Sequence, residues 1–159
     1  MDHPSPSRRS VLRATAGLAL AGSVLTVAAA CANDDEGPDE LEAPLAAARA
    51  DAALAAVAGR TVPDLATRVG PVAAARRAHA DALAAEVRRA RPDRADAVAA
   101  PVADPAPPAS SSAAAAALRT SLGLARDAGT ELAVRTARYR SGLVASVAAA
   151  CGGLAETLA

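Results

Sequence analysis

The sequence predicts an all-α protein in the form of a four-helix bundle. Alanine, which has the highest helix propensity of all residues, is the commonest residue of the chain. Apolar side chains recur every three or four positions in four stretches, as they do on the buried face of a helix. Proline, glycine and serine separate these stretches, which cover residues 38–58, 63–91, 110–138 and 141–158.

The first predicted helix begins either near Pro38 or only at Pro44, because proline is best tolerated in a first turn. Gly59 is a natural stop for it. The second helix begins near Pro63, where Thr61 offers a capping side chain. The apolar stripe of the first helix consists of Leu41, Leu45, Ala48, Ala52 and Ala55.

The second predicted helix carries polar residues on its apolar stripe. Pro71 predicts a kink in this helix or its division into two, and Pro92 ends it. The stripe alternates spacings of four and three, as a helix that faces a core requires. It consists of Leu65, Val69, Val72, Arg76, His79, Leu83 and Glu86 or Val87.

The third predicted helix starts at the serines of residues 110–112. Gly123 and Gly129 weaken it by up to about 1 kcal/mol each relative to alanine. Ser141 is an N-cap candidate for the fourth helix. Because an alanine side chain buries little apolar area, we expect the helices to approach one another closely. The two stripes are Leu118, Leu122, Ala125, Gly129, Leu132, Thr136 and Tyr139, then Val144, Val147, Cys151, Leu154 and Leu158.

The lengths of the connections predict how the helices are joined. The first and second helices, and the third and fourth, are separated by a few residues and should form antiparallel hairpins. Between the pairs lies the Pro-rich segment 91–112, which shows no helical stripe. Extended, it spans ~65 Å at ~3.3 Å per residue, more than the ~40 Å of the longest helix. One long crossover between two hairpins is the ferritin-like topology; the alternative is a simple up-down-up-down bundle.

Composition restricts the classes of partner. The formal net charge is zero, and Tyr139 is the sole aromatic side chain. A basic surface and a set of stacking aromatic side chains are therefore both lacking, and we expect no binding of nucleic acid. The length after residue 40 suits one domain, predicted to be 41–159.

The first 30 residues resemble a signal for the twin-arginine exporter. Arg8 and Arg9 follow a serine and precede Val11 and Leu12 after one residue. The run 14–30 is uncharged but only weakly apolar, so a removable signal is favoured over a retained membrane anchor. We expect an extracytoplasmic protein.

Cys31 follows three alanines, where a bacterial lipoprotein is cut and acylated. We therefore expect a lipid on Cys31 that holds the protein on the outer face of the cell membrane, with residues 31–40 as an acidic tether. The same alanines also satisfy the rule for ordinary signal peptidase. In that case Cys31 could pair with Cys151; otherwise Cys151 is a small buried apolar residue.

Two segments resemble a group of actinobacterial exported proteins with a ferritin-like domain. They are Arg76–Leu83 (RRAHADAL) and Gly142–Ala150 (GLVASVAAA), within a likeness that covers most of 41–158. A ferritin-like metal site needs Glu-x-x-His pairs. In the resembling family a Glu and a His follow the second segment, but here Cys151 and Leu154 stand there. The resemblance thus implies the scaffold without a metal centre or other cofactor.

Arg76 and His79 form a candidate polar site in the core. His79 is either a remnant ligand or pH-sensitive group, or a half-buried imidazole bonded to a carboxylate, which we favour. Arg76 either extends to solvent or forms a buried ion pair. Its candidate partners are Asp51, Asp127 and Glu131, whereas Asp81 and Glu86 are predicted to be solvated.

Three functions remain open. The first is a non-catalytic, lipid-anchored bundle that binds an envelope protein or a small ligand. The second is a ferritin-like metal-binding protein or oxidase, and the third is a structural spacer that self-assembles. The sequence offers no catalytic residues, since a Ser/His/Asp set, a phosphate-binding loop and a Cys-x-x-Cys motif are all missing. We therefore favour the first, without enzymatic activity.

Overall fold

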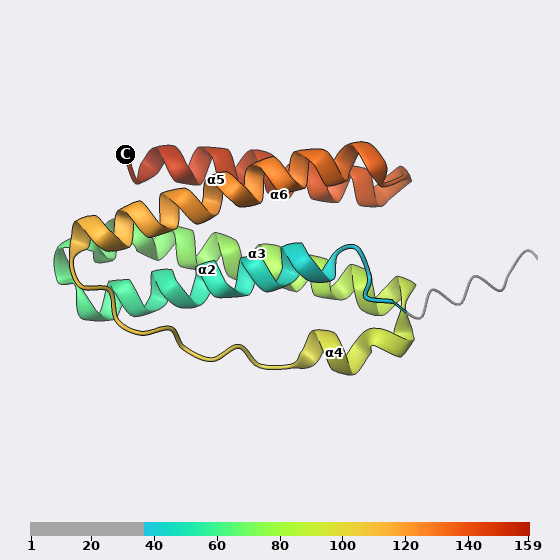
Figure 1. Ribbon diagram of the computed structural model, residues 1–159, viewed down its shortest axis with the longest axis horizontal. Helices are drawn as coiled ribbons and strands as arrows, with labels where there is room; N and C mark the ends of the chain where they lie inside the picture. The colour runs from blue at the N-terminus through green and yellow to red at the C-terminus, as the bar shows by residue number, and fades with distance from the viewer. Residues whose placement is uncertain (1–36) are drawn as a thin grey trace, which may run out of the picture. The chain divides into compact units, whose positions relative to one another are not determined.

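A computed structural model describes residues 37–159, and all regular elements in this range are helices, which confirms the all-α class. No helix in this range is long and apolar enough to cross a membrane. The range forms one compact unit with its own core, as expected of a domain that folds independently. The long helices are α2 (Glu42–Thr61), α3 (Ala66–Ala90), α5 (Ser111–Arg135) and α6 (Arg138–Thr157); the short ones are η1 (Pro63–Leu65), η2 (Pro92–Arg94) and α4 (Ala95–Ala99) (Figure 1).

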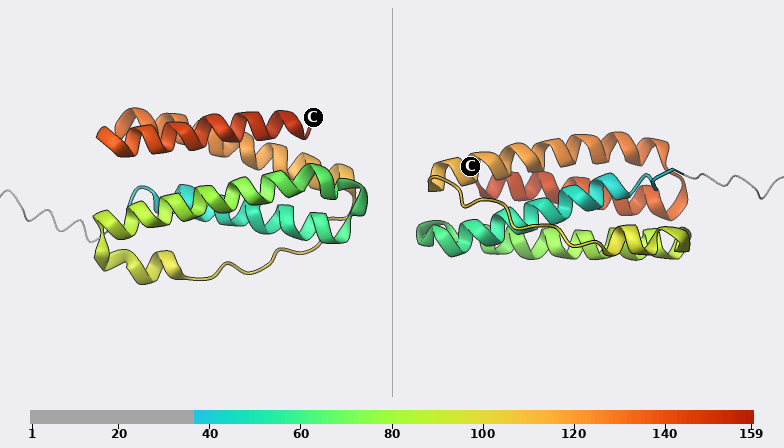
Figure 2. Two further views of the ribbon diagram at one scale, coloured as in Figure 1. Left: turned by 180° about the vertical axis from the view of Figure 1, so that it is seen from behind. Right: turned by 60° about the horizontal axis from the view of Figure 1, so that its bottom comes forward.

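The four long helices pack as two hairpins. Helix α2 lies along α3, and α5 lies along α6; across the hairpins α2 contacts α5 and α3 contacts α6. After α4 the chain runs back along the first hairpin, so that α5 starts near the turn between α2 and α3 (Figures 1 and 2). As a result α5 runs in the same direction as α3.

Two hydrophobic clusters form the core, one toward each end of the helices. The first includes Leu65, Val69 and Leu118, and the second includes Leu41 and Leu83. Alanine supplies much of both clusters, so backbones come close. At Gly129 of α5 an added Cβ would lie 3.0 Å from the Cβ of Ala148 of α6.

Several local predictions are corrected. Helix α3 is not divided at Pro71: it continues through this exposed proline, and the neighbouring Val69 and Val72 are buried in the first cluster. The connection 91–112 is not free of helix: η2 and α4 form in it, and Val98 of α4 is buried in the second cluster. Arg49 fixes this piece by donating to the carbonyl oxygens of Val98 and, at 3.1 Å, of Ala100.

The two serine predictions have different outcomes. Ser110 caps α5, since its Oγ accepts a hydrogen bond from the backbone N–H of Ala113 at 3.1 Å. Ser141 does not cap α6, which already begins at Arg138. Its hydroxyl instead donates to the carbonyl oxygen of Ala133 at 2.7 Å, where α5 is ending.

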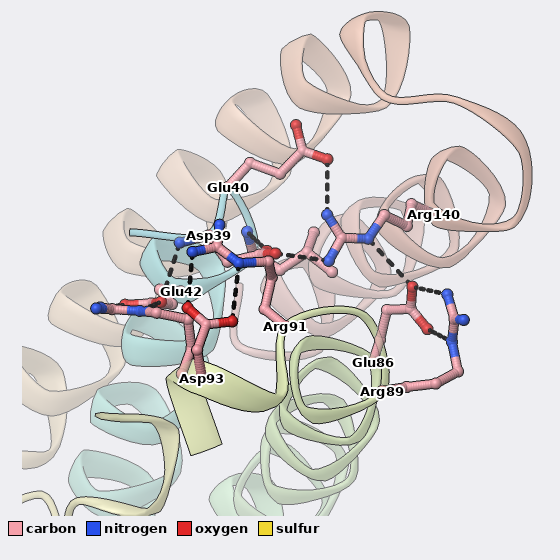
Figure 3. A network of polar contacts seen from close by, with 10 residues as sticks. Asp39, Glu40, Glu42, Glu86, Arg89, Arg91, Asp93 and Arg140 are labelled. Atoms are coloured by element: carbon pink, nitrogen blue, oxygen red, sulfur yellow. Dashed lines mark hydrogen bonds and ion pairs between the residues drawn. The ribbon is translucent and has the colours of Figure 1, made fainter. Parts of the chain in front are cut away.

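A charge network joins the start of the described chain to α3 and α6 (Figure 3). Arg140 pairs with Asp39 at 2.7 Å, with Glu40 at 3.1 Å and with Glu86 at 3.1 Å, and Arg89 also pairs with Glu86. Asp39 is 7% exposed, and Glu40 also pairs with Arg140. Asp39 and Glu40 therefore belong to the folded unit and not to a solvated tether. The prediction that Glu86 is solvated is also wrong, because two arginines compensate its burial.

Candidate functional site

A buried ion pair lies halfway along the first hairpin. Arg76 of α3 and Asp51 of α2 are 1% and 2% exposed, and each sits between residues of the two hydrophobic clusters. The Nε of Arg76 donates to Oδ2 of Asp51 at 2.9 Å, and Nη2 lies 2.7 Å from the same oxygen. Because a charge is rarely buried without a counter-charge, each residue requires the other.

Ser121 of α5 changes the form of this pair. Its hydroxyl donates to the other carboxylate oxygen of Asp51, Oδ1. In the usual two-pronged arrangement each carboxylate oxygen would take one N–H of the guanidinium. Here Nε and Nη2 of Arg76 both face Oδ2. Nε donates a hydrogen bond to it, whereas Nη2 makes no hydrogen bond despite its burial. The site thus keeps one unused donor.

The remaining nitrogen of Arg76 contacts two other side chains. Nη1 lies 3.3 Å from Nδ1 of His79 and 3.2 Å from Sγ of Cys151. Since a guanidinium only donates, Nδ1 is the acceptor and the imidazole carries its proton on Nε2. Burial, and then the charge of Arg76, lower the pKa of His79, and burial raises the pKa of the Cys151 thiol. Near pH 7 both groups are neutral.

A cavity of about 560 Å³ adjoins the pair on the side of Ser121. Arg76 and Ser121 line it, whereas His79 and Cys151, the partners of Nη1, do not. The partners of Nη1 therefore lie away from the cavity, and Arg76 contributes to the wall beside Ser121. The rest of the wall is mostly small or apolar and comes from α2, α5 and α6: Ala43, Pro44, Ala47, Leu124, Ala125, Ala128, Gly129, Leu132, Val144 and Val147. Its charged members are Arg135 of α5 and Glu40, which precedes α2.

The structure brings Arg76 and His79 together as neighbours on α3. His79 is half-buried as expected, but the prediction of a carboxylate partner is wrong, because its Nδ1 faces Nη1 of Arg76. Of the three candidate acids it selects Asp51; Asp127 is exposed and pairs with the adjacent Arg126, and Glu131 is exposed. Sequence reasoning missed Ser121. The available signal was its place one residue before a stripe leucine, which turns its hydroxyl toward the edge of the buried face.

Cys151 is buried as expected, but its sulfur also accepts a hydrogen bond from Arg76. It is a free thiol. The predicted export and lipidation residues, Arg8, Arg9 and Cys31, lie outside the described residues. Within 37–159 no three His, Cys, Asp or Glu side chains gather in a way that could hold a metal ion.

Comparison of the chain with models of protein families, with curated proteins and with solved structures gives no match. The function must therefore be argued from the cavity and the residues around it.

Proposed function

We propose that this chain is a non-catalytic, lipid-anchored protein of the cell envelope that binds a small apolar ligand between its helices. The observation that carries the proposal is the cavity of about 560 Å³ with apolar walls and two polar residues, Arg76 and Ser121, at one side. Small-molecule sites typically combine a volume of roughly 300–1,000 Å³, apolar walls and a few fixed polar groups.

The rigidity of the site supports binding rather than chemistry. Arg76 is held by Asp51, which is itself held by Ser121, so the polar groups are fixed before a ligand arrives. The imidazole of His79 faces Nη1 of Arg76, and His79 is not among the described residues that line the cavity. The carboxylate on the described cavity wall, Glu40, is already paired with Arg140, which favours binding over general-base chemistry there.

For the scaffold we propose a ferritin-like four-helix bundle with one long crossover. The two antiparallel hairpins and the parallel course of α3 and α5 support this topology (Figure 1). So does the return of the chain after α4 along the first hairpin, which a simple up-down-up-down bundle would not need.

For the location we propose export through the twin-arginine pathway and an anchor on Cys31. Mass spectrometry of the protein from a bacterial host with lipoprotein processing tests this. A diacylglyceryl group on Cys31 at the mature N-terminus supports the anchor. An unmodified Cys31, or a chain that still carries Arg8 and Arg9, overturns it.

Ligand binding is tested with N-phenyl-1-naphthylamine, an uncharged probe that fluoresces in apolar sites, and the chain from residue 32. We expect saturable binding of one probe per chain. Ala47→Leu fills the cavity wall and should weaken binding at least tenfold. Ala50→Leu, one turn away on the exposed face of α2, is the matched control and should bind as the original chain does.

Two results would overturn the proposal. One is the lack of saturable binding, or equal binding by the two leucine variants. The other is a stable dimer by light scattering that excludes the probe, since the cavity would then be an interface between two copies of the chain.

A further inference from the structure

We infer that the ligand is uncharged and carries an oxygen acceptor, such as a carbonyl, that takes a hydrogen bond from Nη2 of Arg76. This inference rests on the proposed function and specifies the chemical class of the ligand. It follows from two observations, the unused donor of Arg76 and the balance of charge around the cavity.

The unused donor calls for an acceptor. Nη2 is buried and makes no hydrogen bond, although it lies close to Oδ2 of Asp51. A buried donor without a hydrogen-bond partner loses its hydration and gains no hydrogen bond in return, which destabilises the folded state. Side chains accept hydrogen bonds from Nε and Nη1 of the same guanidinium, whereas Nη2 has only its ion-pair contact with Oδ2 of Asp51 and no hydrogen bond among the described residues. A ligand oxygen that enters from the cavity would remove that cost.

The charge balance calls for an uncharged ligand. Asp51 already compensates the charge of Arg76 at 2.7 Å, and His79 and Cys151 are neutral near pH 7. A ligand carboxylate on Nη2 would be a second anion on one guanidinium, within a few ångströms of Asp51. Its loss of hydration would have no counter-charge to offset it.

The charged residues at the cavity wall do not change this balance. Glu40 is paired with Arg140, and Arg135 is exposed. An exposed arginine is screened by water and salt and contributes little to holding an anion. The geometry therefore favours a ketone, ester or amide oxygen on an apolar body over a fatty-acid carboxylate.

The test compares three eight-carbon competitors for the naphthylamine probe at pH 7: octane, 2-octanone and octanoate. In the Asp51→Leu/Arg76→Met variant, which has no donor, we expect 2-octanone to bind roughly tenfold more weakly than in the original chain. The affinity for octane should not fall. Octanoate should be the weakest competitor of the original chain.

Ser121→Ala is a second variant that keeps both charges. It frees Oδ1 of Asp51, so that the pair can adopt the two-pronged form and occupy Nη2. We expect the same selective loss of 2-octanone binding. This variant keeps the inference testable if the double variant does not fold.

The outcomes separate the inference from the proposed function. If octane and 2-octanone both fail to displace the probe from the original chain, the cavity is not an apolar binding site and both ideas fall. If both displace it but 2-octanone binds equally to the original chain and to the folded variants, the inference alone is wrong. Tighter binding of octanoate than of 2-octanone would also overturn the inference alone.

Discussion

Replacing Asp51 by asparagine should lower the free energy of unfolding by about 3–5 kcal/mol, the range measured when one partner of a buried ion pair is removed. The substitution preserves the volume of the side chain, so it creates no cavity. It leaves the guanidinium of Arg76, which is 1% exposed, without a counter-charge.

The magnitude follows from what Asp51 holds. It accepts a charge-assisted hydrogen bond from Nε of Arg76 at 2.9 Å and a second hydrogen bond from Ser121. Hydrogen bonds to charged groups contribute about 1.5–3 kcal/mol each. Asparagine retains one acceptor oxygen, so the loss should fall between the value of one such bond and that of two. The free energy of unfolding of a whole domain is about 5–15 kcal/mol, so this loss is a large share of it.

Urea unfolding followed by circular dichroism at 222 nm measures the change. Asp127→Asn is the matched control, because Asp127 is also helical but its side chain is 63% exposed. Its effect should stay within about 0.5 kcal/mol. The double variant Asp51→Leu/Arg76→Met removes both charges and should be within about 1 kcal/mol of the original chain or more stable.

Two results would refute this reasoning. The first is a free energy of unfolding of the Asp51→Asn variant within 1 kcal/mol of that of the original chain. This would mean that water or another acid replaces Asp51 as the partner of Arg76. The second is a double variant as unstable as Asp51→Asn, which would mean that the cost comes from packing rather than from an uncompensated charge.

Three further predictions concern acid, glycine and thiol. The hydrogen bond from Arg94, and then the backbone N–H of Asp39, lower the pKa of Glu42 to about 2. The Glu42–Arg94 ion pair therefore stabilises the fold fully above the ordinary pKa of 4.5, and this contribution is lost as the pH falls toward 2. Urea unfolding should show that the free energy of unfolding falls by about 1 kcal/mol over this range, and Arg94→Gln should abolish the change. Gly123→Ala has open space around the new Cβ and should stabilise α5 by up to about 1 kcal/mol. Gly129→Ala should stabilise α5 less or destabilise it, because its Cβ would lie 3.0 Å from the Cβ of a neighbouring alanine. Equal increases in the melting temperatures of the two variants would contradict the close approach of α5 and α6. Burial raises the pKa of the thiol at position 151, so in the chain from residue 32 it should react with a disulfide reagent only in urea, and rapid labelling of the folded protein would be the contrary result.

The periodicity of apolar residues was sufficient to predict the long helices, because helix propensity and stripe agree along most of the chain. The periodicity failed where contacts between residues distant in sequence determine whether a helix forms or a side chain is buried. Helix α4 forms because Val98 reaches the second cluster and Arg49 binds the carbonyl oxygens at its end, and neither contact is visible locally. The burial of Glu86 was missed because Arg140, one of the two arginines that compensate its charge, is distant in sequence.

The candidate site shows the same division. Arg76 and His79 could be placed on a buried face from their spacing alone, and a buried arginine demands an acid. The choice of Asp51 could not be made from spacing, since it depends on how far α2 slides along α3. Neither could the role of Ser121, which belongs to the other hairpin and meets Asp51 only after the hairpins dock.

The central claim, that the cavity beside Arg76 binds an uncharged apolar ligand, is tested most directly by NMR. In a ¹H–¹⁵N titration with 2-octanone, the account predicts saturable shifts at the backbone amides of Ser121, Ala125 and Gly129 and at Nε–H of Arg76. Unchanged spectra would contradict it. So would shifts confined to Ala52, Ala99 and Val102, which line a separate cavity of about 410 Å³ beside the crossover.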